Sequence, residues 1–134
     1  MNKGTKFYKC DFQVHTPRDI NWTGNKPVTD EDRNTYAQNF VLACRSKGVN
    51  AVAITDHHDL TFFPFIKRAA QNELDNDGNP IDESKRLVVF PGVELTLSNP
   101  PIQALLILDS NFPEDQLIRV LHKLSLEPNP IEER

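Results

Sequence analysis

Thr55-Asp56-His57-His58-Asp59 follows directly on the apolar run Val49 to Ile54, and this stretch decides the fold class. The run is short and rich in β-branched residues, which predicts a buried strand of a parallel sheet. Functional groups collect at the C-terminal ends of such strands in α/β proteins. Burying these ionisable residues unpaired would be costly, so we expect them to be solvated, paired or bound to a metal.

Two other runs place ionisable groups in the same way. Asp11-Phe12-Gln13-Val14-His15-Thr16 ends a predicted strand over Phe7 to Val14. Phe90-Pro91-Gly92-Val93-Glu94-Leu95 lies at the end of one over Leu87 to Phe90, which Val93 to Leu97 could continue. A turn at Pro91-Gly92 would allow close backbone approach and let Glu94 point inward. Imidazole and carboxylate groups from three separate strand ends predict a metal site, because both are common ligands of divalent metals.

The remaining pattern alternates helices with strands. Thr29 is a predicted helix start, an apolar stripe at helical spacing follows it, and Gly48 is the predicted stop. A second helix is predicted over Phe62 to Leu74, a strand over Ala104 to Leu108, and a helix over Pro113 to Leu126. This order indicates an α/β architecture with mainly parallel strands.

The composition fits an ordinary soluble domain. The chain has 134 residues, 38% hydrophobic and 25% charged, and a net charge of −4. A broad basic face for nucleic acid is not expected, although bound divalent cations could still bring a phosphate to a nuclease site. No apolar run approaches the roughly 20 residues of a membrane helix. Cys10 and Cys44 are predicted to be two buried free thiols, and the expected location is cytoplasmic.

The three runs together resemble the motifs of the PHP (polymerase and histidinol phosphatase) domain. Asp11 to Thr16 resembles its first motif, usually Asp-Leu-His-x-His-Thr. Thr55-Asp56-His57 resembles its second motif, and Pro91-Gly92-Val93-Glu94 looks like its Gly-x-Glu motif. The resemblance covers about residues 7 to 110. Cys10 to Trp22 looks like the PHP domains joined to SMC- or AAA-like ATPase regions, some of which are linked to anti-phage defence.

The resemblance implies a distorted (β/α)7 barrel and a site of about two or three divalent cations (Mn, Zn, Fe or Mg) at its C-terminal rim. It also implies hydrolysis of phosphate esters, including nucleotides or nucleic-acid phosphodiesters. His15 and His57 would be metal ligands, and Glu94 would bridge two metals. The implied role of Asp11 and Asp56 is to orient those ligands.

Several residues have open roles. Gln13 stands where the first motif usually has a histidine, and Gln103 stands where another histidine is often found. An amide oxygen at either place would suit a harder metal, or would mark the loss of part of the site. Arg18 is either a phosphate clamp or a surface partner of Asp19. His58 and Asp59 could transfer protons or complete a metal shell.

The length departs from the family pattern, because a PHP barrel usually needs many more residues and later His and Asp motifs. Half a barrel would leave a sheet edge unpaired. We therefore expect residues 1–134 to form one incomplete PHP-like domain, with residues 127–134 as a frayed tail or linker. The expected partner is the remainder of a longer chain or an ATPase region, and a homo-oligomer is left open. The alternative function is a non-catalytic PHP domain that binds or assembles with an ATPase partner.

Overall fold

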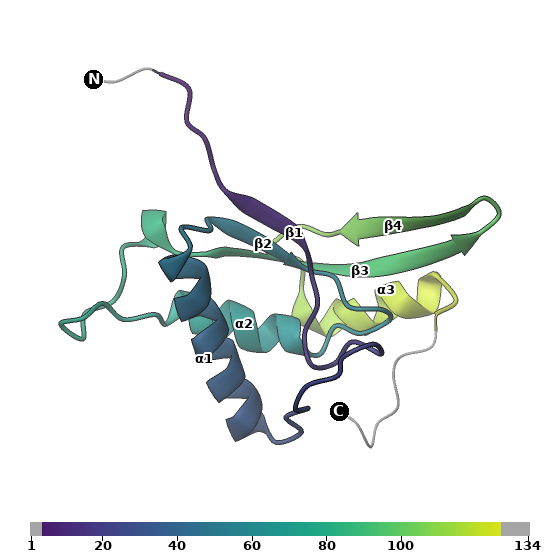
Figure 1. The fold of residues 1–134 in the computed structure, drawn as a ribbon, viewed down its shortest axis with the longest axis horizontal. Helices are drawn as coiled ribbons and strands as arrows, with labels where there is room; N and C mark the ends of the chain where they lie inside the picture. Colours follow the sequence, from purple (N-terminus) through teal and green to yellow (C-terminus); the bar gives the residue numbers. More distant parts are fainter. Residues whose placement is uncertain (1–3, 127–134) are drawn as a thin grey trace.

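A curled four-stranded sheet forms the frame of the computed structural model, which describes residues 4–126 (Figure 1). Its strands are β1 (Cys10–Val14), β2 (Ala51–Ile54), β3 (Val88–Ser98) and β4 (Pro101–Ile107), and they lie in this order across the sheet. β2 is parallel to both β1 and β3, whereas β4 is antiparallel to β3. The predicted mixed α/β class with mainly parallel strands is confirmed. The predicted tail at 127–134 lies outside the described residues.

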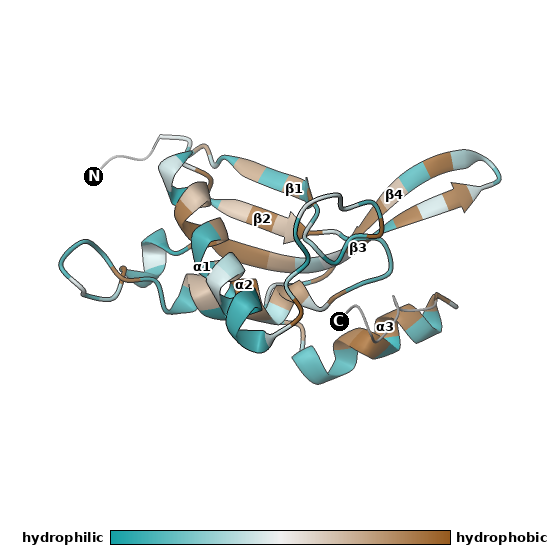
Figure 2. Ribbon diagram, turned by 60° about the horizontal axis from the view of Figure 1, so that its bottom comes forward, coloured by the Kyte–Doolittle hydropathy of each residue, from teal (hydrophilic) through white to brown (hydrophobic). Residues whose placement is uncertain are grey.

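The helices cover one face of the sheet (Figures 1 and 2). They are α1 (Asp30–Ser46), α2 (Phe62–Gln71) and α3 (Leu117–Lys123), with short 3-10 turns at Glu83–Lys85 and Glu114–Gln116. The core between helices and sheet is built from buried apolar side chains of all these layers, among them Val41, Val52, Ile54, Phe62, Phe63, Ile66, Val89 and Leu117. No helix within residues 4–126 is long and apolar enough to cross a membrane.

Local signals set the limits of α1 as the sequence predicts. The Thr29 side chain accepts a hydrogen bond from the Asp32 N–H, which satisfies one free donor of the first turn. Three acidic residues in that turn complement the positive end of the helix dipole. Gly48, at a φ of +68°, adopts the left-handed conformation that ends the helix.

The third predicted strand is present with its continuation over Val93 to Leu97, but the turn expected within it is absent. Pro91 and Gly92 do not form a turn, because β3 runs without a break from Val88 to Ser98. Pairing with β4 along this length outweighs the local tendency of Pro-Gly to interrupt a strand. The close backbone approach expected at Gly92 is confirmed, since an added Cβ there would lie 2.5 Å from the Leu106 carbonyl oxygen.

The face of the sheet opposite the helices is partly open. Phe12 and Phe90 meet edge to face across it, with ring centroids 5.9 Å apart. Phe12 is nevertheless 42% exposed, and Cys10 on the same edge strand is exposed as well. The prediction of two buried thiols is therefore wrong for Cys10, because β1 is an edge strand, and confirmed for Cys44 in the core.

We expect Gly92→Ala to destabilise the fold. The new methyl group would lie 2.5 Å from the Leu106 carbonyl oxygen, so β3 and β4 must separate. It would also lie 3.1 Å from the Thr55 side chain. The expected loss in the free energy of unfolding is about 1–3 kcal/mol, measured by urea denaturation. Ser98→Ala, at an exposed position of the same strand, is the control and should change stability by less than about 0.5 kcal/mol. Equal stability of the parent and Gly92→Ala would contradict the close approach.

Candidate metal centre

The three predicted site segments meet at one end of the parallel strands. His15 follows β1 directly, and Asp56 and His57 follow β2. The chain after β2 continues to pair with its neighbours, because the Thr55 N–H donates to the Val14 carbonyl at 2.8 Å and the Glu94 N–H donates to the Asp56 carbonyl at 3.2 Å. His57 and Glu94 form an isolated parallel bridge. Strand pairing therefore fixes the positions of His15, His57 and Glu94 relative to one another along the strand direction.

His15, His57 and Glu94 bring three potential ligand atoms together. The Nε2 atoms of His15 and His57 lie 3.2 and 3.1 Å from the same oxygen, Glu94 Oε2. The two imidazole rings are stacked almost in parallel, with centroids 5.4 Å apart and an interplanar angle of 9°. Glu94 is fully buried, whereas both histidines are partly accessible. The group is thus anchored inside and reachable from one side.

The contacts within this group do not satisfy its buried carboxylate. Glu94 Oε2 has no hydrogen-bond partner, although the Nε2 atoms of two histidines lie close to it. A buried carboxylate oxygen without a partner is costly. Ligands held at about 2.1 Å from a tetrahedral zinc ion lie roughly 3.4 Å from one another. The donor set and its spacing fit a divalent cation shared by His15, His57 and Glu94.

Asp19 lies in the candidate site, although the sequence analysis did not place it there. Its Oδ1 accepts hydrogen bonds from both the backbone N–H and the Nδ1 of His57, each at 2.8 Å. Because a carboxylate only accepts, Nδ1 of His57 carries a proton, and in the neutral imidazole Nε2 then keeps its lone pair. Burial pushes the pKa of Asp19 upward, but the hydrogen bonds from His57 and Asn21, together with the charge of His15, hold that pKa below its usual value. The only sequence signal is its position, four residues after His15.

Asp56 lies near the Nδ1 atom of His15, whereas Glu94 lies near its Nε2 atom. Its Oδ1 is 3.8 Å from the His15 Nδ1, which has no hydrogen-bond partner, and Asp19 Oδ1 is 3.2 Å from the same nitrogen. His15, Asp19 and Asp56 therefore form a second group that could hold a cation. Burial raises the pKa of Asp56 to about 7 against the effect of hydrogen bonds from Thr16. Those bonds, from the Thr16 N–H and hydroxyl, hold the turn after His15 in place.

Gln13 also reaches the centre, through an irregularity in β1. Asp11 pairs with Val52 and Val14 with Ile54, so β1 holds one more residue than β2 over this interval. Such a bulge redirects a side chain. The Gln13 amide nitrogen donates to Glu94 Oε1 at 3.0 Å and so secures the oxygen that does not face the histidines.

Asp11 and Gln103 lie outside the two groups that could hold a cation. Asp11 is exposed, and its carboxylate accepts a hydrogen bond from the Gln13 N–H within β1. Gln103 is exposed on β4, where it pairs with Thr96. The structure therefore brings His15, His57, Glu94, Asp56 and Gln13 together and leaves these two at a distance in the sheet.

Arg18 and Asp59 form a buried ion pair. Arg18 is 4% exposed, and its Nε and Nη2 lie 3.0 and 2.7 Å from Asp59 Oδ2. The surface position considered for Arg18 is therefore wrong. The other oxygen of Asp59 accepts a hydrogen bond from the Thr61 N–H at the start of α2. With both oxygens engaged, Asp59 joins the loop after β1 to the start of α2.

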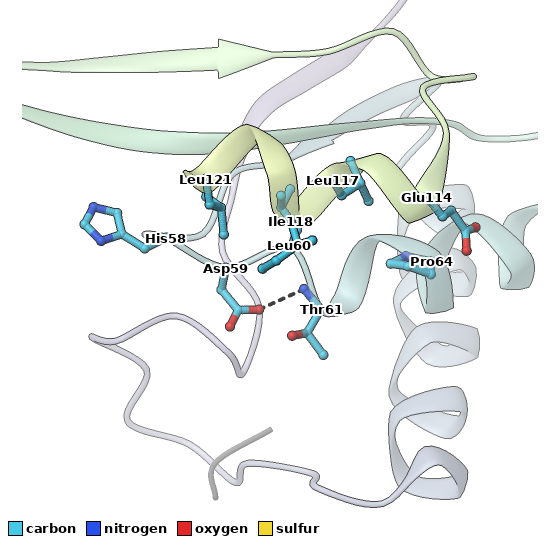
Figure 3. Close-up of a pocket in the computed structure, with 9 residues that line it drawn as sticks. All are labelled: His58, Asp59, Leu60, Thr61, Pro64, Glu114, Leu117, Ile118 and Leu121. Atoms are coloured by element: carbon cyan, nitrogen blue, oxygen red, sulfur yellow. Dashed lines mark hydrogen bonds between the residues drawn. The ribbon is translucent and has the colours of Figure 1, made fainter. Parts of the chain in front are cut away.

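His58 belongs to neither group of potential metal ligands. Its backbone adopts a left-handed φ of +53°, which turns the chain between His57 and Asp59. The side chain lies at the outer end of a separate pocket of about 200 Å³ between the start of α2 and the region of α3 (Figure 3). The pocket is lined largely by apolar residues, including Leu60, Pro64, Leu117, Ile118 and Leu121.

Comparisons of this chain with protein-family models, with curated proteins and with solved structures find no match. The interpretation of the centre therefore depends on its own geometry and on the resemblance of its motifs.

We expect Asp19→Asn to weaken metal binding. An amide cannot replace the charge that keeps the proton on Nδ1 of His57, and loss of such a supporting carboxylate costs about 10- to 100-fold in metal affinity. Isothermal titration with Zn²⁺ measures the effect. Asp77→Asn, in an exposed turn, makes the same charge change and should bind as the parent does. Equal affinities in Asp19→Asn and the parent would show that Asp19 does not support the ligands.

We expect Asp59→Ala to cost about 3–5 kcal/mol of unfolding free energy, because it leaves the Arg18 charge buried without this partner. His58→Ala is the neighbouring control and should cost about 1 kcal/mol or less, since His58 is partly exposed. Thermal and urea unfolding provide the measurement. An Asp59→Ala protein as stable as the parent would contradict a stabilising role for the ion pair of Arg18 and Asp59. A proton-transfer role for Asp59 would then be the one to test.

Proposed function

We propose that this chain is a metal-dependent phosphoesterase module with a PHP-type barrel architecture. The observation that carries the proposal is the convergence of the His15 and His57 Nε2 atoms on Glu94 Oε2, a buried oxygen that has no hydrogen bond. Two imidazoles and one carboxylate are a common ligand set of catalytic zinc, in which a further position stays open for water or substrate. The motif resemblance supports phosphate esters as the substrate class.

The charge of the centre supports the same conclusion. Asp19, Asp56 and Glu94 are all buried around His15, and an anionic substrate would be repelled from them without bound cations. Bound divalent cations would supply an activated water as nucleophile and neutralise charge on the phosphate oxygens. A phosphoryl group could therefore approach this rim only together with metal.

The side chains of this chain have distinct roles in the proposal. His15, His57 and Glu94 hold the cation, and Gln13 fixes Glu94 through its second oxygen. Asp19 keeps the proton on the far nitrogen of His57, so that Nε2 remains available as a ligand. Asp56 holds the Thr16 turn and thereby the position of His15. The reaction requires no protein nucleophile.

The wider context is part of the proposal and rests on the resemblance. Substrates would be nucleotides or nucleic-acid phosphodiesters, and the partner would be the remainder of a longer chain or an SMC- or AAA-like ATPase region. The setting would be cytoplasmic, with anti-phage defence as the biological role. The open sheet face around Phe12 is compatible with further protein covering it.

A second function is favoured by Gln13. In the motif that the chain resembles, a histidine stands at this place, whereas here the amide is bonded to Glu94. A site with one ligand fewer could bind metal without catalysis, or bind none. The chain would then be a binding or assembly module for an ATPase partner.

Metal content separates these functions. We expect the chain, purified without chelator, to contain Mn, Fe or Zn by mass spectrometry or to take up the metal on titration. A His15→Ala/His57→Ala protein should lose this metal and any phosphatase or nuclease activity that the parent has. His122→Ala is the matched control, because His122 lies on α3 and belongs to neither cation-binding group.

Each outcome decides between the functions. Metal that is lost in the double variant and kept in His122→Ala, together with hydrolysis of phosphate esters, supports the enzyme. Metal without hydrolysis favours the binding module. Absence of metal uptake by a folded parent chain, monitored by circular dichroism, would overturn the proposed centre.

A further inference from the structure

The loop after β1 forms a second wall beside the metal centre. A pocket of about 310 Å³ is lined by His15, Asp19, Asn21, Trp22, Thr23 and Gly24. Two of these, His15 and Asp19, belong to the candidate metal centre, and the others come from the loop. The pocket is therefore lined both by residues of the candidate metal centre and by Trp22.

The loop that carries Trp22 is firmly anchored. The Asp19 N–H donates to the Thr16 carbonyl at 2.9 Å, and the Trp22 N–H donates to the Asp19 carbonyl at 3.0 Å. The Asn21 N–H adds a bond to the Asp19 carboxylate at 3.0 Å. Asp19 thus connects the two parts of the pocket, since the same carboxylate orients His57.

The indole of Trp22 is fixed in orientation as well. Its Nε1 donates to the Asn25 carbonyl at 3.2 Å, and its ring meets Tyr36 edge to face at a centroid distance of 6.4 Å. Tyr36 in turn contacts the buried Phe62 ring at 5.0 Å. Gly24 leaves room for this arrangement, because an added Cβ there would lie 2.9 Å from the indole nitrogen. The ring is only partly buried and lines the pocket.

We propose that Trp22 forms the stacking wall of a subsite for a nucleobase, and that the substrate of the metal centre is a nucleoside phosphate or a nucleotide unit of a strand. A rigid, partly exposed indole offers a flat apolar surface on which any base can stack. The exposed Asn21 and Thr23 beside it offer polar groups for the edge of the base. A phosphate on the same molecule would lie toward His15 and Asp19.

This inference depends on the proposed function for the position of the phosphate, but it has a separate measurement. Trp22 is the only tryptophan of the chain, so its fluorescence reports directly on the pocket. We expect adenosine 5′-monophosphate to quench this fluorescence in the presence of Zn²⁺, whereas ribose 5-phosphate and inorganic phosphate should not. A stacked base should bind about 5- to 150-fold more tightly than ribose 5-phosphate, measured by isothermal titration.

Two substitutions sharpen the test. Trp22→Ala should lower the affinity for adenosine 5′-monophosphate to that for ribose 5-phosphate and leave Zn²⁺ affinity unchanged. Trp22→Phe keeps an aromatic ring and should retain part of the difference. Phe7→Ala removes an aromatic side chain that is 91% exposed and absent from the pocket, and it should bind both ligands as the parent does.

The outcomes distinguish this inference from the proposed function. Equal affinity for adenosine 5′-monophosphate and ribose 5-phosphate in the parent, or the same preference in Trp22→Ala, overturns the stacking wall even where Zn²⁺ binds. Quenching by adenosine 5′-monophosphate without Zn²⁺ uptake supports the subsite and overturns the metal-dependent function. The absence of both quenching and Zn²⁺ uptake would overturn the nucleobase subsite and the metal-dependent function together.

Discussion

The burial of carboxylates at the ends of the parallel strands is the constraint on which the rest of this site depends. Each carboxylate is compensated by a different neighbour: Asp59 by the Arg18 guanidinium, Asp56 by the Thr16 hydroxyl and N–H, and Asp19 by His57. Glu94 receives the Gln13 amide on one oxygen only. Within residues 4–126, its Oε2 is the buried carboxylate oxygen that has no hydrogen bond. A cation at this position would complete the compensation.

The sheet supplies the geometry for this centre through a small residue in β2, the strand between β1 and β3. Ala53 of β2 is completely buried between Asp11–Val14 of β1 and Phe90 of β3. A small residue there lets side chains of β1 reach β3 across the strand between them, as Phe12 does with Phe90. The bulge in β1 then turns Gln13 toward Glu94. The same parallel pairing that fixes the fold therefore also fixes which side chains meet.

The parts of this structure that depend on local sequence were predictable, whereas those that depend on distant pairing were predictable only where a general rule of parallel sheets applies. The cap at Thr29, the stop at Gly48 and the strand before Asp56 follow from neighbouring residues. The convergence of His15, His57 and Glu94 followed from the rule that parallel strands end together. The continuity of β3 depended on β4, which local Pro-Gly chemistry does not reveal. The burial of Arg18 likewise depended on a partner 41 residues away, and Asp19 acquires its role only when the loop folds onto His57.

Gln13 shows how the structure changes the argument about metal identity. As a ligand, its amide oxygen would favour a hard cation such as magnesium. In this structure, however, the amide presents its NH2 group to Glu94 Oε1, at 3.0 Å. In that orientation Gln13 contributes no oxygen to the cation and instead holds Glu94 so that Oε2 faces the two imidazoles. Imidazole nitrogens would then dominate the donor set of a cation bound here, which would favour zinc or iron over magnesium.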